Sequence, residues 1–159
     1  MEKTLITTNS KQTQKLGELL ARELRGGEVI CLDGELGAGK TTFTQGLLKG
    51  LKIKGPYTSP TFLIIKHYKK EFPIPNFQFP NKSQNPKSKI QNIYHIDAYR
   101  VGVQDILDLG FEEILSNKKN IIIIEWAKRI KKIIPSNAVW VDFEWLEENK
   151  RKITFKAKF

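Results

Sequence analysis

The sequence predicts a single α/β domain with a central, mostly parallel β-sheet between two layers of helices and a C-terminal β-hairpin. Two patterns predict this fold class. Short apolar runs typical of buried strands alternate with helical segments along most of the chain, whereas the C-terminal segment alternates apolar and polar residues. At 159 residues, 40% of them hydrophobic, the chain has the size and apolar content for one core.

The first part of the chain is expected to contain two helices and two strands. Leucines recur at the spacing of one helical face in residues 10–24, with Ser10 as a suitable N-cap and two glycines just beyond the end. Residues 28–32 form an apolar run that predicts a strand, and residues 42–51 read as the next helix. Residues 57–68 predict a strand entered from a loop, with its apolar part at Phe62 to Ile65.

The second part is interrupted by residues 71–91, where four prolines stand among polar residues without helical or strand periodicity. We expect a long, flexible inserted loop there, because structureless segments of more than about 15 residues are uncommon in compact domains unless they are functional or disordered. The remaining elements are expected at residues 93–97 (strand), 104–115 (a helix that Gly110 can split), 121–124 (a strand buried on both faces), and 138–145 with 151–159 (the terminal hairpin).

Residues 34–41 fit the pattern G-x-x-x-x-G-K-T, the sequence form of a phosphate-cradling loop. The apolar run before it and the helix after it supply the strand–loop–helix context that the motif requires, which predicts a P-loop NTPase-like three-layer sandwich. Lys40 is then expected to reach the β- and γ-phosphates of a nucleoside triphosphate, and Thr41 to offer its hydroxyl to Mg²⁺. The alternative is a glycine-rich turn that merely joins a strand to a helix.

Two carboxylates follow predicted strands directly, Glu125 after four isoleucines and Asp97 after residues 93–96. The carboxyl ends of parallel strands form the edge where open α/β sheets bind ligands. Glu125 is therefore expected to hold Mg²⁺, directly or through water, or to polarise the attacking water. The plainer alternatives are a charge that ends a strand for Glu125 and a turn former for Asp97. Thr58-Ser59-Pro60-Thr61 is stiffened by its proline, and its hydroxyls are candidate sensors of the γ-phosphate.

Charge and cysteine content constrain the partners and the compartment. The formal net charge of +10 suits RNA or another polyanion, although a solvated lysine-rich face explains it equally well. The sequence contains no apolar run long enough to span a membrane and no secretory signal, so we expect a cytoplasmic protein without a membrane partner. Its single cysteine, Cys31, is expected to pack in the core.

An ordered set of motifs resembles the TsaE family, also called YjeE, over nearly the whole chain outside the insertion. The motifs are GELGAGKTTF, TSPTF, YHIDAYR, DLGFEEIL and IIIIEWAKR, with Pro135 following the last. The order of the set is far more specific than any one member. Residues 71–91 exceed the length usual in the family, and Ala98 replaces a commonly larger apolar residue.

The resemblance implies a small P-loop ATPase that uses ATP and Mg²⁺ and acts with TsaB-like and TsaD-like proteins. The modification implied is threonylcarbamoyladenosine at position 37 of tRNAs that read codons beginning with A, with tRNA reached indirectly through the complex. Lys40, Asp97 and Glu125 would be catalytic, and Thr41 and Glu125 would hold the metal. The nucleotide would be bound by the following residues, the adenine lying between Asn9 and the hairpin turn at Asn149: Asn9, Glu35, Leu36, Gly37, Ala38, Gly39, Lys40, Thr41, Thr42, Thr58, Ser59, Thr61 and Asn149.

Two other functions stay open on the sequence alone. A small-molecule kinase on the same fold would need a lid and an acceptor pocket, and the sequence offers no arginine-rich lid segment. A nucleotide-gated binding module would depend on conformation rather than on turnover. Two interpretations of the insertion at residues 71–91 also stay open: a dispensable disordered loop, and a lysine-bearing arm that contacts RNA.

Overall fold

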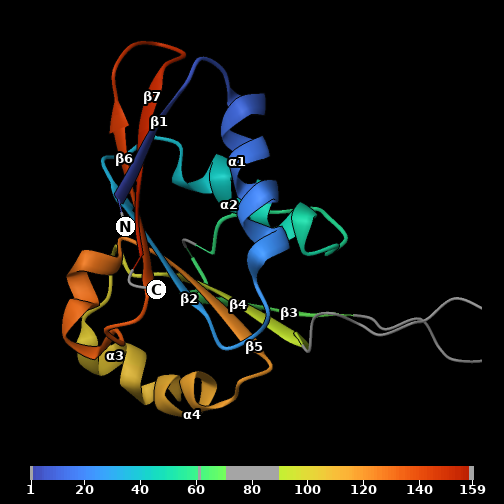
Figure 1. Ribbon diagram of the computed structural model, residues 1–159. Coiled ribbons are helices and arrows are strands. Elements are labelled where there is room, and N and C mark those ends of the chain that lie inside the picture. The colour runs from blue at the N-terminus through green and yellow to red at the C-terminus, as the bar shows by residue number, and fades with distance from the viewer. Residues whose placement is uncertain (1, 61, 71–89, 158–159) are drawn as a thin grey trace, which may run out of the picture.

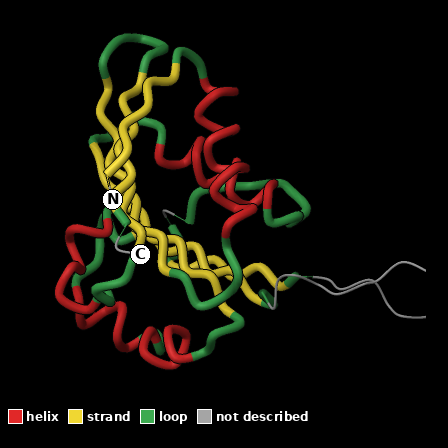
Figure 2. The backbone as a smooth tube through the Cα atoms, in the orientation of Figure 1, coloured by secondary structure: helices red, strands yellow, loops and turns green. Residues whose placement is uncertain are grey.

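A computed structural model describes residues 2–60, 62–70 and 90–157 of the protein. Within these residues one sheet of seven strands has the order β1-β7-β6-β2-β5-β4-β3, and helices lie on both of its sides (Figures 1 and 2). The strands are β1 (Glu2–Thr7), β2 (Val29–Gly34), β3 (Ile65–Lys69), β4 (Asn92–Asp97), β5 (Asn120–Glu125), β6 (Val139–Trp145) and β7 (Arg151–Lys156). The helices are α1 (Ser10–Glu23), α2 (Lys40–Gly50), α3 (Val103–Asp108), α4 (Phe111–Ser116) and the 3₁₀ segment η1 (Ala127–Ile133).

The centre of the sheet is parallel and its edges are antiparallel. β6, β2, β5 and β4 pair in parallel, whereas β3 pairs antiparallel with β4, and β7 with both β6 and β1. Every residue of β5 is buried. The predicted parallel strand covered on both faces and the predicted terminal hairpin are therefore confirmed.

Two apolar cores, one on each face, make the molecule a three-layer sandwich. Side chains of a strand alternate between faces, so Ile121 and Ile123 of β5 pack toward α1 and α2, among residues such as Phe43 and Leu47. Ile122 and Ile124 pack in the other core, with Phe111 and the buried Cys31. The predicted fold class is confirmed, as is the core position of Cys31.

Some element boundaries differ from the sequence prediction. The apolar segment from Phe62 does not begin a strand, because the amides of Leu63 and Ile64 both bond to the Pro60 carbonyl and close a turn. The strand β3 begins only at Ile65, and the Phe62 side chain is 87% exposed. The split that Gly110 was expected to allow in the helix at residues 104–115 is present: α3 and α4 are separated at Gly110, whose φ of 82° lies in the left-handed region.

The strand β1 and the 3₁₀ segment η1 were not predicted. The insertion predicted at residues 71–91 lies outside the described residues except for its last two. Ile90 is buried. The Gln91 carbonyl accepts a hydrogen bond from the Lys70 amide and the Gln91 amide donates one to the Lys119 carbonyl, so Gln91 continues the sheet hydrogen bonding beyond the start of β4. Within residues 2–60, 62–70 and 90–157, no helix is both long and apolar enough to cross a membrane.

The two helices on one face, α1 and α2, approach so closely that a side chain at Gly46 has no room. A Cβ added there would lie 2.0 Å from the backbone oxygen of Gln14 on α1. We expect Gly46→Ala to lower the free energy of unfolding by about 1–3 kcal/mol, because overpacking outweighs the gain of about 1 kcal/mol in helix propensity. Urea unfolding of the parent and the variant measures this change in the free energy of unfolding. Lys11→Ala, on the exposed face of α1, should change stability by no more than about 0.5 kcal/mol, and an equally stable Gly46→Ala protein would contradict the packing described.

Candidate nucleotide-binding site

The glycine-rich segment joins β2 to α2, in the strand–loop–helix context that the sequence predicted. Gly39, at the N-cap of α2, has a φ of 107°, a conformation that side chains other than glycine rarely adopt. The amide of Ala38 donates a hydrogen bond of 3.1 Å to the Glu35 carbonyl, which closes the loop tightly. No atom of the described chain approaches within 4 Å of the place a Cβ would take at Gly37. The loop therefore offers an open backbone cradle at a helix N-terminus, the arrangement that binds anions.

The Lys40 side chain folds back onto this loop. Its Nζ donates to the carbonyls of Gly34 (2.6 Å) and Glu35 (2.9 Å), and it lies 3.9 Å from the centre of the Trp126 ring. Burial lowers the pKa of Lys40, against the opposing effect of Glu125 and two aspartates. An anion bound in the cradle would compete with these two carbonyls for the ammonium group.

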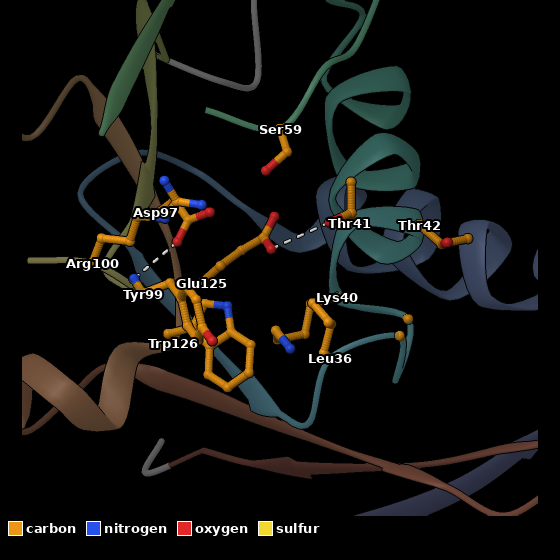
Figure 3. A pocket seen from close by; sticks show the side chains of 12 residues that line it. Leu36, Lys40, Thr41, Thr42, Ser59, Asp97, Tyr99, Arg100, Glu125 and Trp126 are labelled. Carbon is orange, nitrogen blue, oxygen red and sulfur yellow. Dashed lines mark hydrogen bonds between the residues drawn. The ribbon is translucent and has the colours of Figure 1, made fainter. Parts of the chain in front are cut away.

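A cleft of about 360 Å³ opens beside Lys40 (Figure 3). It draws side chains from the loop, from the start of α2 and from the ends of β4 and β5. Its lining residues are Leu36, Gly37, Gly39, Lys40, Thr41, Thr42, Ser59, Asp97, Tyr99, Arg100, Glu125 and Trp126. The three residues predicted to be catalytic thus share one cleft.

The carboxylates of Asp97 and Glu125 stand side by side because their strands pair in parallel with these two residues in register. Both are buried, at 7% and 3% exposure. The Thr41 hydroxyl donates to Glu125 Oε2 at 3.3 Å, and His95 Nε2 lies 2.8 Å from the other oxygen, Oε1. Asp97 Oδ1 accepts a hydrogen bond from the Tyr99 amide at 2.9 Å.

A smaller cavity of about 180 Å³ lies on the other side of the loop, between the start of α1 and the hairpin turn. Asn9 and Asn149 line it, together with Gly37, Gly39 and Thr42. Asn9 also caps α1, because its Oδ1 accepts from the Gln12 amide at 2.9 Å. The cavity adjoins the phosphate cradle at the predicted adenine position, and the assignment of the base to it stays a prediction.

Not every predicted binding residue lines these cavities. Ser59 faces the main cleft, whereas Thr58 is exposed and its hydroxyl accepts a hydrogen bond from Lys66 Nζ at 2.6 Å. Thr61 lies outside the described residues. Glu35 belongs instead to a third cavity, of about 630 Å³, on the β6–β7 side of the loop.

Trp126, Tyr99 and Arg100 also line the cleft, although they are not among the site residues that the sequence predicted. Trp126 follows Glu125 with a φ of 60°, in the left-handed region, so its ring is directed over Lys40 rather than along the strand. In the sequence, the available signals for these cleft residues were their neighbours: Trp126 follows Glu125, and Tyr99 and Arg100 lie close after Asp97.

This fold, with a phosphate-type loop between β2 and α2 and two carboxylates at the adjoining strand ends, defines a nucleotide-binding protein of the P-loop class. The family model described as "Threonylcarbamoyl adenosine biosynthesis protein TsaE" matches residues 7–153. The chain belongs to the TsaE family.

Relatives and a solved structure agree with this assignment. Proteins named tRNA threonylcarbamoyladenosine biosynthesis protein TsaE are similar to the chain in Aquifex aeolicus (37% identity, covering 98% of this chain and 97% of the relative) and Bacillus subtilis (32%, covering 95% and 83%). The crystal structure of Bacillus subtilis YdiB superposes with a TM-score of 0.72 at 27% identity and covers 99% of this chain and 86% of that chain.

The lowered pKa of Lys40 leads to a prediction about stability. Between that lowered pKa and the ordinary value of 10.5, the unfolded chain holds a proton that the folded chain has lost, so the Lys40 contribution to stability rises with pH. We expect Lys40→Met to be at least as stable as the parent at pH 7 and to lose this advantage as the pH rises toward 10. Urea unfolding of both proteins from pH 7 to 10 measures the difference, and a constant difference over the whole range would contradict it.

Proposed function

We propose that the protein is an ATPase that uses ATP and Mg²⁺ to support formation of threonylcarbamoyladenosine in tRNA, together with TsaB-like and TsaD-like proteins. Membership of the TsaE family supports the pathway. The observation that carries the proposed activity is the 3.3 Å contact between the Thr41 hydroxyl and Glu125, which joins the first turn of α2 to the end of β5. In P-loop hydrolases a hydroxyl and a carboxylate in these two positions hold Mg²⁺.

The donor set fits a magnesium ion that is bound together with a nucleotide. Among the described residues no group of three or more His, Cys, Asp or Glu side chains could hold a metal alone. Mg²⁺ usually takes one or two protein ligands and completes its shell with phosphate oxygens and water, so Thr41 and Glu125 are sufficient. When bound there, the ion would neutralise charge on the β- and γ-phosphates.

The remaining residues have separate proposed tasks. Lys40 would leave the carbonyls of Gly34 and Glu35 for the triphosphate, and the loop amides would donate to phosphate oxygens. Asp97 would orient the attacking water, since it stands beside Glu125 at the same sheet edge. Together these groups would favour transfer of the γ-phosphate to water.

Partner dependence is supported by apolar side chains near the cleft. Leu36 and Phe62 are each 87% exposed, Leu63 is 69% exposed, and the Phe62 ring lies 5.7 Å from the guanidinium of Arg100 in the cleft wall. Large apolar side chains exposed beside a binding cleft are candidate protein contacts. A TsaD-like or TsaB-like protein bound there would cover the site.

Reconstitution with the other pathway proteins tests the proposed function. We expect Lys40→Ala and Glu125→Gln each to lower both phosphate release from labelled ATP and threonylcarbamoyladenosine formation by about 100-fold or more, because each removes an electrostatic contact to the phosphates or their metal. Glu113→Gln makes the same chemical change on the exposed face of α4 and should leave both rates unchanged.

Three outcomes would contradict the proposed function. Undiminished tRNA modification by Lys40→Ala would remove the need for nucleotide binding. Transfer of labelled phosphate to a metabolite instead of water would favour a kinase. Full modification with a non-hydrolysable ATP analogue would favour a nucleotide-gated binding module, which needs binding but no turnover.

A further inference from the structure

His95 is a buried polar side chain whose role neither the sequence motifs nor the proposed chemistry explains. It lies on β4, two residues before Asp97 and on the same face of the sheet, and it is 1% exposed. Its Nε2 lies 2.8 Å from Glu125 Oε1. The Glu125 carboxylate thus has a different partner on each oxygen, His95 on Oε1 and Thr41 on Oε2.

The two ring nitrogens of His95 have different surroundings. Within the described residues, His95 Nδ1 is buried and has no hydrogen-bond partner. A proton on Nδ1 would bury an N–H with nothing to accept it, which costs about 1–3 kcal/mol. A carboxylate oxygen accepts hydrogen bonds and therefore needs the N–H on Nε2. The contact with Glu125 therefore places an N–H on Nε2.

The pairing of β4 with β5 places the His95 side chain next to Glu125. In the β4–β5 ladder His95 is opposite Ile123, and Asp97 is opposite Glu125. The imidazole therefore comes from the strand beside Glu125 and is held by the core around it. A different rotamer of Glu125 would lose its hydrogen bonds to both His95 and Thr41. The His95 hydrogen bond to Oε1 therefore favours the rotamer in which Oε2 accepts from Thr41.

We propose that His95 is a positioning residue that holds Glu125 Oε1 and so directs Oε2 toward Thr41 and the Mg²⁺ that these two residues would bind. This inference rests on the proposed metal role of Thr41 and Glu125. It assigns to His95 no contact with nucleotide or metal. Residues that orient metal ligands in this way typically change metal affinity by about 10–100-fold when they are replaced.

Two substitutions separate positioning from simple core filling. The amide nitrogen of glutamine can reach the place of His95 Nε2, whereas the shorter asparagine resembles the Nδ1 side of the ring and cannot reach Glu125. We expect His95→Gln to bind a fluorescent ATP analogue as the parent does, with and without Mg²⁺. For His95→Asn we expect about 10-fold or greater weakening with Mg²⁺, and affinity close to the parent in EDTA.

His67→Asn is the matched control, because His67 is the other histidine of the chain, is exposed and stacks on Tyr94 away from the cleft. It should bind as the parent does under both conditions. Equal weakening of His95→Asn with Mg²⁺ and in EDTA would indicate a purely structural role and would overturn the proposal. So would a His95→Asn protein with unchanged Mg²⁺-dependent binding.

A measurement on the unsubstituted protein covers the case in which the His95 variants do not fold. Nitrogen NMR of the protein with labelled histidines, assigned with His67→Asn, should show a proton on His95 Nε2, the atom that faces Glu125. A bare Nε2 would leave no donor for the carboxylate and would overturn the proposal. Failure of the proposed metal role can be told apart from failure of this inference. If Thr41 and Glu125 held no Mg²⁺, the parent would bind nucleotide equally with Mg²⁺ and in EDTA, while His95 would still carry its proton on Nε2.

Discussion

The parallel register of β4, β5 and β2 is the constraint on which the site depends. It sets Asp97 opposite Glu125 and Glu125 opposite Leu32, two residues before the loop begins at Gly34. Segments far apart in the sequence therefore meet at one edge of the sheet. A slip of one residue would turn the Glu125 side chain to the opposite face, toward α3 and α4 and away from Thr41. The apolar packing of β5 on both faces opposes that slip, so the stability of the core and the geometry of the site have the same origin.

Four polar or charged side chains are buried at this edge of the sheet, although such side chains are rarely found inside a folded protein. Lys40, His95, Asp97 and Glu125 are all at least nine-tenths buried, and buried polar groups cost free energy unless they are hydrogen-bonded. Here the compensation comes from neighbours within the site, namely loop carbonyls for the ammonium group and His95 and Thr41 for the Glu125 carboxylate. Because Lys40 and Glu125 already have partners within the site, a ligand needs only to exchange partners with them rather than to order them.

The phosphate loop and the two carboxylates could be predicted from the sequence because each depends on local pattern, a glycine spacing or a charge after an apolar run. The strand β1 could not, because Glu2 to Thr7 bury little more than Thr7 and acquire their strand conformation by pairing with β7. The start of a strand at Phe62 was predicted wrongly for a related reason. A turn closed on the Pro60 carbonyl overrides the strand propensity of the apolar residues that follow. The orientation of the Trp126 ring and the partner of His95 depend on backbone conformation and on contacts across strands, which no pattern in one segment records.

We propose above all that the cleft beside Lys40 binds a nucleoside triphosphate, with Mg²⁺ held between Thr41 and Glu125. A crystal structure with Mg²⁺ and a non-hydrolysable ATP analogue tests it most directly. We expect phosphates in the loop, Lys40 Nζ moved from the Gly34 carbonyl to a phosphate oxygen, and the ion at Thr41 Oγ1 and the Glu125 carboxylate. A nucleotide bound elsewhere, with Lys40 still on its own loop carbonyls, would contradict it.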